Sequence, residues 1–367
     1  MDLELSDEQV WLEESVNKLL DREWPPAEVA WTAGAADRQR LWNSLVAFGL
    51  LEGGDGRLGA IELCLAARAL GTHLASVPFL GSVAVRYALA PFMAELPDGF
   101  TALLDGDDRL SIAVLEPGAG WAAKAVRATL ECNRLTGEKA AVEYASDVDA
   151  LAVVARVDGD LGLVLVPSGT PGVTLTGQAS LDATLPLSRV QFTAAEATAV
   201  LGDQPAEVIV DQLLTIGGLL ACAESIGAAT RIFADARQYA AERRQFGRTI
   251  GSNQALRHLM SDLHVRNASG WSTTLFAAAA LDDAIPGARQ TASIAQAYVA
   301  RAAREVAHGS IQVFGGIAFT EEHPAHRFLR RIVVREQQFG DAGHHERELG
   351  RGLAEAAGRR LADEVVA

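Results

Sequence analysis

The pattern of the sequence changes twice along the chain, and this constrains the fold more than any single motif. Between Leu110 and Leu201, short runs alternate apolar, often β-branched residues with polar ones, as half-buried strands do. Turn residues recur about every ten positions, as in small all-β domains, and Asp158-Gly159-Asp160 is a hairpin signal. A small β-barrel or sandwich is predicted, with strands at Ile112–Leu115, Val126–Cys132, Ala150–Val157, Leu161–Val166, Gly172–Leu175 and Leu187–Phe192.

Helical patterns flank this region on both sides. A capping box at Ser6 and Gln9 opens the first helix. We expect an α+β protein with an N-terminal helical domain (1–104), a middle β domain (105–202) and a C-terminal domain of the four-helix-bundle type (203–367). The other predicted helices are Asp37–Phe48, one from the joint Gly53–Gly59 to Leu70, one across Pro78 to Met93, Glu207–Arg243, Asn253–Ala280, Ala288–His308, Pro324–Gln337 and Glu346–Val365.

Four arginines share one face of the predicted helix Pro324–Gln337. They stand at three- and four-residue spacing, at Arg327, Arg330, Arg331 and Arg335. Such a face is usually solvated or salt-bridged at the surface. We expect this of Arg327 and Arg335.

Composition excludes several classes of protein. A net charge of -15 and a pI near 5.0 argue against nucleic acid and membrane surfaces as partners. No apolar run approaches the roughly 20 residues of a membrane span, and the acidic start of the chain is unlike a signal peptide. Three scattered cysteines fit reduced thiols, with neither a disulfide framework nor a metal site. A cytoplasmic protein is expected.

A pair of glycines, Gly315 and Gly316, breaks a helical pattern that runs through Gln312. A second helical pattern restarts behind Thr320, with Glu322 and His323 in its first turn. Backbone without Cβ atoms lets a bulky ligand come close, and a helix start offers free N–H groups to an anion. An ordinary joint between two helices explains the same residues equally well.

Two segments together, Tyr239–Asp262 and Ala307–Arg331, resemble the C-terminal domain of the acyl-CoA dehydrogenase family. The family pattern is Arg-x-Phe-Gly followed by Gln, then Gln-x-x-Gly-Gly, Thr-x-Glu-x-Pro and an Arg pair. The resemblance implies a three-domain fold, bound FAD and α,β-dehydrogenation of an acyl-CoA thioester. The matching residues are Arg244, Phe246, Gly247, Gln254, Gln312, Gly315, Gly316, Thr320, Glu322, Pro324, Arg330 and Arg331.

The family reaction requires a carboxylate base, which the resemblance places at either of two positions. One is a Glu before Gly, shortly after the paired arginines, and Phe339 stands there in this chain. The other lies on the first long bundle helix, and it falls at about Gly217. Neither residue accepts a proton. We therefore expect no catalytic base at either place.

Residues that would face the flavin ring differ as well. In the family, a Thr-Glu-Pro loop and a Lys-x-Trp-Ile-Thr strand contact the isoalloxazine. Here Leu115 replaces the first hydroxyl, Ala141 replaces the indole, and Glu143 replaces the second hydroxyl. A carboxylate close to the flavin opposes the negative charge that its reduction brings.

Residues that would reach a neighbouring subunit's FAD are retained: Arg244, Phe246, Gln254, Gln312, Gly315 and Gly316. The chain thus resembles the base-lacking subunit of bacterial α2β2 acyl-CoA dehydrogenases that act on steroid side-chain thioesters. This implies a second, related subunit, an acyl-CoA substrate and an electron-transfer flavoprotein as acceptor. Two alternatives stay open: a self-sufficient enzyme whose base is Asp211, Glu224 or Glu336, and a flavin-free acyl-CoA-binding scaffold.

Overall fold

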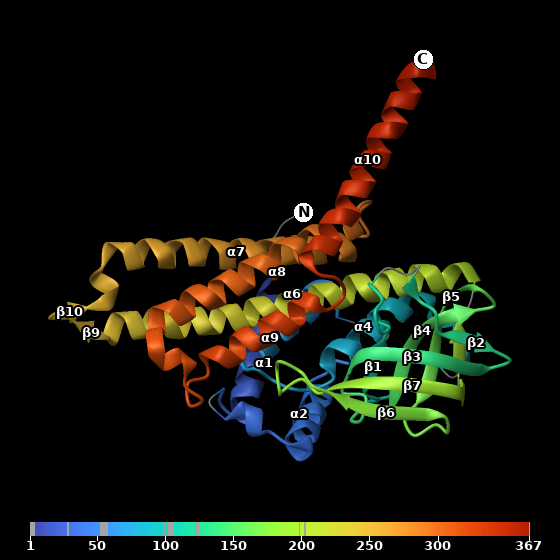
Figure 1. Ribbon diagram of the computed structural model, residues 1–367, viewed down its shortest axis with the longest axis horizontal. Helices are drawn as coiled ribbons and strands as arrows, with labels where there is room; N and C mark the ends of the chain where they lie inside the picture. The colour runs from blue at the N-terminus through green and yellow to red at the C-terminus, as the bar shows by residue number, and fades with distance from the viewer. Residues whose placement is uncertain are drawn as a thin grey trace.

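One helix, α6 (Asp203–Glu242), runs from the β domain at one end of the molecule to a small hairpin at the other (Figure 1). The computed structural model describes residues 4–27, 29–51, 58–98, 100–101, 106–121, 125–197, 199–201 and 203–366. The segment of α6 around Leu213, Ile216 and Leu220 is buried on all sides, which explains its continuous apolar sequence. Among the described residues, Ala206–Glu242 is long and apolar enough for a membrane span. However, 72% of its most apolar window is buried inside the protein.

The N-terminal domain packs against α6 through α3 (Ala60–Thr72) and α4 (Phe79–Leu89), and α1 (Asp7–Glu23) packs on α3. The capping box of Ser6 and Gln9 is present at the start of α1. Helices α3 and α6 cross closely, since a Cβ at Gly71 or Gly227 would lie 2.0 Å from a backbone oxygen of the other helix. The domain also contains α2 (Ala35–Ala47) and the 3-10 segments Ala30–Thr32 and Ala90–Glu95.

The expected helix across Pro78 is wrong at its start. Pro78 is the N-cap of α4, and the helix begins at Phe79. A proline has no N–H to give to an earlier turn, so the first turn of a helix suits it better than the interior. Most of the predicted joint Gly53–Gly59 and the predicted domain boundary at 104/105 lie outside the described residues.

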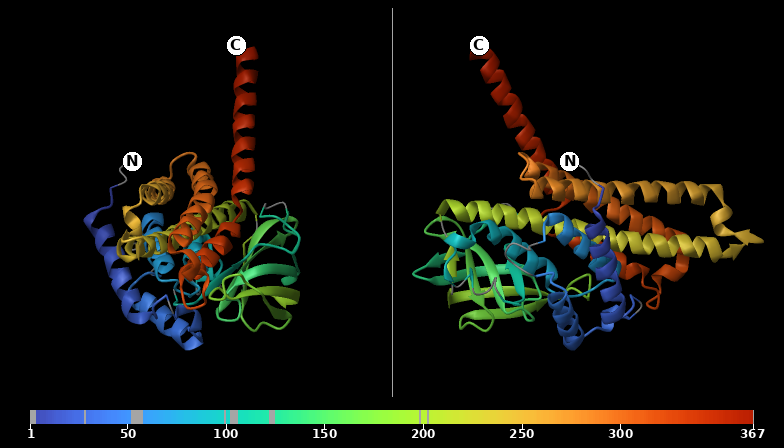
Figure 2. Two further views of the ribbon diagram at one scale, coloured as in Figure 1. Left: turned by 60° about the vertical axis from the view of Figure 1, so that its left-hand side comes forward. Right: turned by 180° about the vertical axis from the view of Figure 1, so that it is seen from behind.

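The middle domain is one eight-stranded sheet in the order β6-β7-β3-β2-β4-β5-β8, with β1 paired to β4 (Figures 1 and 2). The predicted hairpin at Asp158-Gly159 joins β4 and β5, and both residues have positive φ. The sequence pattern did not predict β3, whose register shifts twice against β7. The strands are β1 (Leu110–Ala113), β2 (Thr129–Glu131), β3 (Arg134–Glu143), β4 (Ala150–Val157), β5 (Asp160–Pro167), β6 (Val173–Gln178), β7 (Leu187–Glu196) and β8 (Ala199–Leu201).

The C-terminal helices form a bundle along α6. Helices α7 (Gln254–Asp282), α8 (Ala288–Phe314) and α9 (Ala325–Gln337) pack with it, while α10 (Ala342–Val366) projects away from the body in every view (Figures 1 and 2). Between α6 and α7 lies the hairpin of β9 (Arg244–Gln245) and β10 (Arg248–Thr249). The expected helix restart behind Thr320 is wrong, because a 3-10 turn (Gly315–Phe319) follows α8 and α9 begins only after Pro324.

Candidate cofactor site

The two positions predicted for a catalytic base meet at one place. Gly217 lies on α6, and Phe339 lies in the turn between α9 and α10. A Cβ built on Gly217 would lie 2.6 Å from Cε1 and 2.7 Å from Cζ of the Phe339 ring, closer than such atoms approach in proteins. The phenyl ring therefore occupies the space in which a side chain at position 217 would begin. Two segments of chain converge on this point, and neither brings a carboxylate.

Phe339 is held in an unusual backbone conformation. Its φ is +60° and its side chain is only 8% exposed. A left-handed conformation costs a non-glycine residue roughly 1–2 kcal/mol. Gly340 follows with φ +111°, which glycine adopts without that cost. The surroundings of Phe339 must therefore stabilise this turn.

A second aromatic ring lies against Phe339. The ring centroids of Trp121 and Phe339 are 5.3 Å apart, and the indole N–H of Trp121 donates to the carbonyl of Gln337 at 3.0 Å. The space left beside them is a cavity of about 30 Å³, lined also by Ala141 and Glu143. That space holds a few water molecules at most, since one water needs roughly 10–15 Å³ of such volume. The residues of this chain's own β domain therefore do not fit an isoalloxazine ring as they stand.

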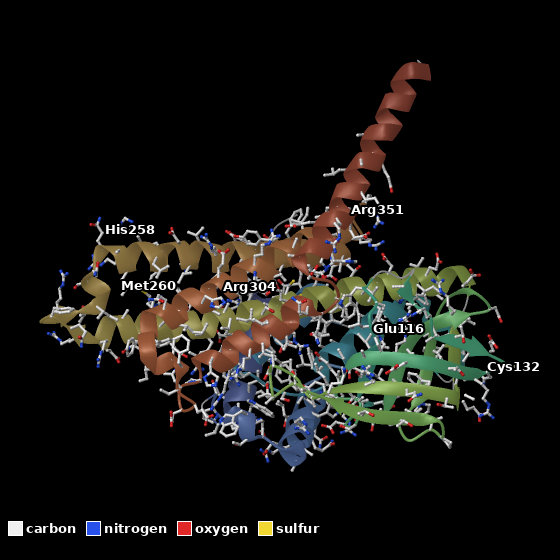
Figure 3. All side chains as sticks on the ribbon, viewed as in Figure 1. Glu116, Cys132, His258, Met260, Arg304 and Arg351 are labelled. Atoms are coloured by element: carbon white, nitrogen blue, oxygen red, sulfur yellow. The ribbon has the colours of Figure 1, made fainter. Side chains whose placement is uncertain are left out.

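The loop and strand expected beside a flavin are held by internal contacts. The Ala141 N–H donates to Oε1 of Gln178 at 2.7 Å. Glu116 lies in the β domain (Figure 3), where its carboxylate accepts from Nζ of the buried Lys139 at 2.8 Å. Burial raises the pKa of Glu116, but hydrogen bonds from Lys139 and two backbone amides outweigh it and lower the pKa to about 2. Glu116 is thus an ionised structural residue.

Glu143 is not the free carboxylate that its place in the sequence suggests. Its Oε1 accepts from Nη1 of Arg335 and from Nε2 of Gln338. The positive charge of Arg335 compensates the charge of Glu143. The obstacle to a flavin here is therefore steric more than electrostatic.

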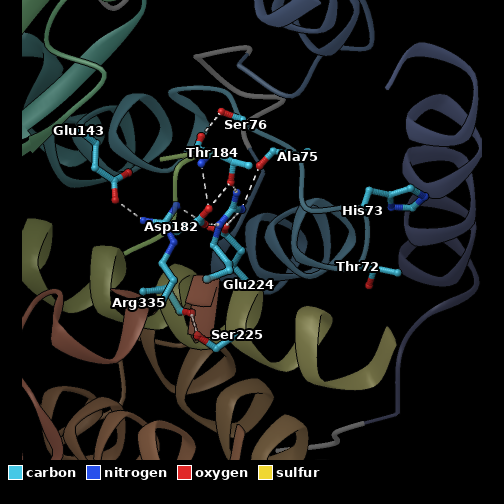
Figure 4. Close-up of polar contacts among 12 residues, drawn as sticks. Thr72, His73, Ala75, Ser76, Glu143, Asp182, Thr184, Glu224, Ser225 and Arg335 are labelled. Atoms are coloured by element: carbon cyan, nitrogen blue, oxygen red, sulfur yellow. Dashed lines mark hydrogen bonds and ion pairs between the residues drawn. The ribbon is translucent and has the colours of Figure 1, made fainter. Parts of the chain in front are cut away.

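Arg335 and Arg331 belong to a buried ionic cluster that joins all three domains (Figure 4). The Arg331 guanidinium donates to Asp182 of the β domain, to Glu224 of α6, and to the carbonyl of Ala75 in the N-terminal domain, at 2.5, 2.5 and 3.0 Å. Arg335 also binds Glu224, at 2.8 Å. Each buried charge here has a partner, as burial requires.

Of the two states expected for Arg327 and Arg335, solvated or salt-bridged, Arg335 is in the second, since it pairs with Glu143 and Glu224. Neither arginine is solvated, because both are buried. Arg327 lies over the ring of Trp31, 4.8 Å from its centroid, and donates to the carbonyl of Glu321 at 2.7 Å. Helical spacing places these arginines on one face, but it does not tell whether water or another domain covers that face.

The alternative base candidates are engaged in ion pairs. Glu224 belongs to the buried cluster, and Glu336 pairs with Arg304 at 3.0 Å. Asp211 pairs with Arg289 at 2.8 Å, and burial raises its pKa although Arg289 lowers it. Asp211 and Phe339 both line a cavity of about 720 Å³ beside α6. Of the three candidates, Asp211 alone lines this cavity.

The residues predicted to reach a neighbour's FAD lie at the opposite end of the bundle from the β domain (Figure 1). Arg244 and Phe246 are on the β9–β10 hairpin, and Phe246 is 100% exposed. Gln254 opens α7, and Gln312 is exposed near the end of α8. The rings of Tyr239 and Phe314, 5.3 Å apart, hold the ends of α6 and α8 together.

The glycine pair at the end of α8 is open. No atom lies within 4 Å of a Cβ built on Gly315 or Gly316, and φ of Gly315 is +70°. Arg244 lies at the same end of the bundle, and an arginine side chain and open backbone are both groups that bind phosphate in proteins. The two ends of the molecule therefore differ: the hairpin end presents an exposed arginine and open glycine backbone, and the β-domain end does not fit an isoalloxazine ring.

Sequence reasoning missed two features of the site. Trp121 carried no signal, because it meets Phe339 only through the tertiary fold. The 720 Å³ cavity was equally hidden, since its lining residues, among them Thr215, Leu281 and His345, come from distant segments.

Comparison with known proteins agrees with these observations. The family model described as "Acyl-CoA dehydrogenase, C-terminal domain" matches residues 206–353. The acyl-CoA dehydrogenase FadE27 of Mycobacterium tuberculosis is 32% identical over 336 residues, covering 87% of this chain and 89% of that protein.

Solved structures share the whole fold. A chain of the ChsE4–ChsE5 complex from Mycobacterium tuberculosis superimposes with a TM-score of 0.83 at 27% identity, covering 97% of this chain and 99% of that one. A variant of the Tcur3481–Tcur3483 steroid ACAD superimposes with a TM-score of 0.84 at 24% identity, covering 96% and 99%.

Proposed function

Because this chain belongs to the acyl-CoA dehydrogenase family of FAD-dependent oxidoreductases, we propose that it is the base-lacking subunit of a hetero-oligomeric acyl-CoA dehydrogenase. In this role it lends FAD contacts to a related partner subunit that carries the base. FAD, when bound, accepts the hydride in α,β-dehydrogenation of an acyl-CoA thioester. The substrate is a steroid side-chain thioester, and an electron-transfer flavoprotein takes the electrons.

One observation carries this proposal. The exposed residues suited to phosphate, Arg244 with Gly315 and Gly316, lie at the far end of the bundle from this chain's own β domain. A ligand held there belongs to another subunit. The FadE27 relative and a solved complex named for two chains, ChsE4 and ChsE5, support the same reading.

The residues then divide the work as follows. Arg244 binds the pyrophosphate as a fork, and Phe246 packs on the partner's surface beside it. Backbone at Gly315 and Gly316 approaches the cofactor where a Cβ would intrude. Gln254 and Gln312 donate side-chain N–H groups at the same end. No proton leaves the substrate through this chain, since positions 217 and 339 hold no carboxylate.

Flavin content tests the proposal. The chain is purified alone and together with a related subunit that has Glu at one of the two base positions, and bound FAD is measured from its absorbance. We expect little FAD in the chain alone and full occupancy in the complex. Arg244→Ala should weaken FAD binding by the complex roughly tenfold to hundredfold, the value of a charge-assisted hydrogen bond.

Arg248→Ala is the matched control, because Arg248 is exposed on the other strand of the same hairpin. Its FAD content should equal that of the parent complex. A chain that binds stoichiometric FAD by itself would contradict the proposed role. Unchanged FAD content in the Arg244→Ala complex would contradict the contact in trans.

A self-sufficient dehydrogenase is the second candidate, favoured only by Asp211. Its carboxylate lines the same 720 Å³ cavity as Phe339, and burial raises its pKa, which makes the carboxylate a stronger base. Asp211 is, however, six residues before Gly217 on α6, about 9 Å along the helix axis.

A further inference from the structure

We propose that Glu143 is a specificity-determining residue that keeps the flavin ring out of this chain's own β domain. It acts as a latch: it holds the turn 338–340 across the place where the ring would lie. The inference rests on the proposed function only in its consequence, that FAD is directed to the partner. Its test needs the isolated chain alone.

The latch spans two domains. Glu143 is the last residue of β3, and it binds Arg335 and Gln338 at the end of α9. Arg335 also donates to Oε1 of Gln338 at 2.5 Å, so the three side chains contact each other in a closed triangle. The side chains of Glu143 and Arg335 are 14% and 3% exposed. Little water competes for these contacts, which strengthens them.

The latch fixes the residue that fills the site. Gln338 is bound on both sides, and the next residue, Phe339, has left-handed backbone that turns its ring into the space beside Gly217. Trp121 then lies on Phe339 and donates to the carbonyl of Gln337. Each contact of this group depends on the position of the turn.

Aromatic side chains occupy the space in which the flavin ring is expected. Ala141 stands where the family resemblance puts an indole, and Trp121, from another loop, lines the same residual cavity as Ala141. The indole of Trp121 therefore lies close to the place that the family indole would occupy, although it comes from a different segment. Trp121 and Phe339 also line the 720 Å³ cavity beside α6, but only about 30 Å³ is free between them and Ala141. A three-ring flavin on that side requires both rings to move.

Glu143→Thr breaks the latch, because a threonine side chain is too short to reach Arg335. Arg335 keeps its ion pair with Glu224, so the variant leaves no buried charge without a partner. Glu138→Thr is the matched control: it makes the same change on the same strand and removes an exposed ion pair with Arg189, 3.0 Å long. Glu143→Gln preserves the shape and loses only the charge.

Hydrogen–deuterium exchange of residues 337–341 in the isolated chain is the main readout. The Gln338 N–H donates to the carbonyl of Arg335 at 3.1 Å and reports on the turn. We expect exchange to rise roughly tenfold or more in Glu143→Thr, less in Glu143→Gln, and not at all in Glu138→Thr. Acrylamide quenching, with Trp121→Phe as reference, should show Trp121 becoming accessible in Glu143→Thr alone.

Riboflavin, which carries the ring without pyrophosphate, provides the ligand test. The combination of Glu143→Thr with Trp121→Gly should bind riboflavin measurably, and the parent should not. Exchange that is equal in Glu143→Thr and the parent overturns the latch. If exchange rises in Glu143→Thr but Arg244→Ala leaves FAD in the complex unchanged, the latch is supported and the contact in trans is wrong. If exchange does not rise but Arg244→Ala loses FAD, the contact in trans is supported and the latch is wrong.

Discussion

At the scale of single residues, Gly217 and Phe339 explain one another. The phenyl ring needs the space that glycine leaves, and glycine at 217 is required while that ring is present. Gly217→Glu would therefore disturb the turn before its carboxylate reached any substrate. Absence of a base at these positions is built into the packing of the site and does not depend on one substitution.

Asp211→Asn tests whether this chain supplies a base from elsewhere. In the assembled complex we expect turnover within a few-fold of the parent, since a true general base contributes about 10²–10⁴ in rate. Asp235→Asn is the control, because Asp235 lies on the same helix and also pairs with an arginine, Arg231. A hundredfold loss confined to Asp211→Asn, with FAD retained, would favour the self-sufficient enzyme. Glu224→Gln is less informative, since Glu224 holds the buried cluster.

At the scale of helices and strands, sequence motifs correctly predicted the features that depend on contacts between residues close in sequence. The capping box at Ser6, the hairpin at Asp158-Gly159 and the break at Gly315 are present as expected. The family resemblance placed a strand at Lys139–Glu143, the second half of β3. Alternation did not predict this strand, because two register shifts interrupt it. The helix predicted at Pro324–Gln337 is confirmed within one residue by α9, whereas Glu322 and His323, expected in a helical first turn, come before it.

The candidate site was predictable only in part. The family motifs located Gly217 and Phe339, and the structure brings these two together. The partner of Glu143 lies 192 residues away, and Trp121 meets a residue of α9 216 positions later. Contacts of that kind arise from packing between domains, which no local pattern encodes.

His345, in the first turn of α10, should make the stability of the chain depend on pH. Burial, and then His344, lower the pKa of His345 from 6.5 to about 4, against weaker opposing effects of nearby backbone and Asp341. The unfolded chain therefore binds a proton more readily than the folded one between pH 6.5 and 4. Stability is full above this window and falls as pH decreases through it.

The free energy of unfolding should fall between pH 6.5 and 4.5 by about 2 kcal/mol less in His345→Leu than in the parent. Urea unfolding at the two pH values measures this. His308→Leu changes an exposed histidine on α8 and serves as the control. If the free energy of unfolding falls by the same amount between pH 6.5 and 4.5 in His345→Leu and in the parent, another group controls the acid sensitivity.

At the scale of the whole molecule, the buried cluster around Arg331 joins the three domains. Its partners, Ala75, Asp182 and Glu224, belong to the N-terminal domain, the β domain and the bundle (Figure 4). Domain motion that separated them would leave buried charges without partners. The body of the molecule is therefore expected to unfold as one unit.

Arg331→Met tests this joint. Removing one partner of a buried ion pair leaves Asp182 without its arginine and should destabilise the chain by about 3–5 kcal/mol in urea unfolding. Arg330→Met alters the exposed neighbour on the same helix and should cost less than about 0.5 kcal/mol. Equal effects of the two substitutions would mean that the cluster contributes little beyond surface charge.

The contact between Gly217 and Phe339 also determines the order in which positions 217 and 339 can change during evolution. A carboxylate cannot return to position 217 while the ring is present, because its first carbon would lie 2.6 Å from that ring. A smaller residue at 339 has to come first. A lineage that had lost both bases could regain the helical one only by this two-step path, and the intermediate, with an emptied pocket and no base, would offer selection nothing to favour.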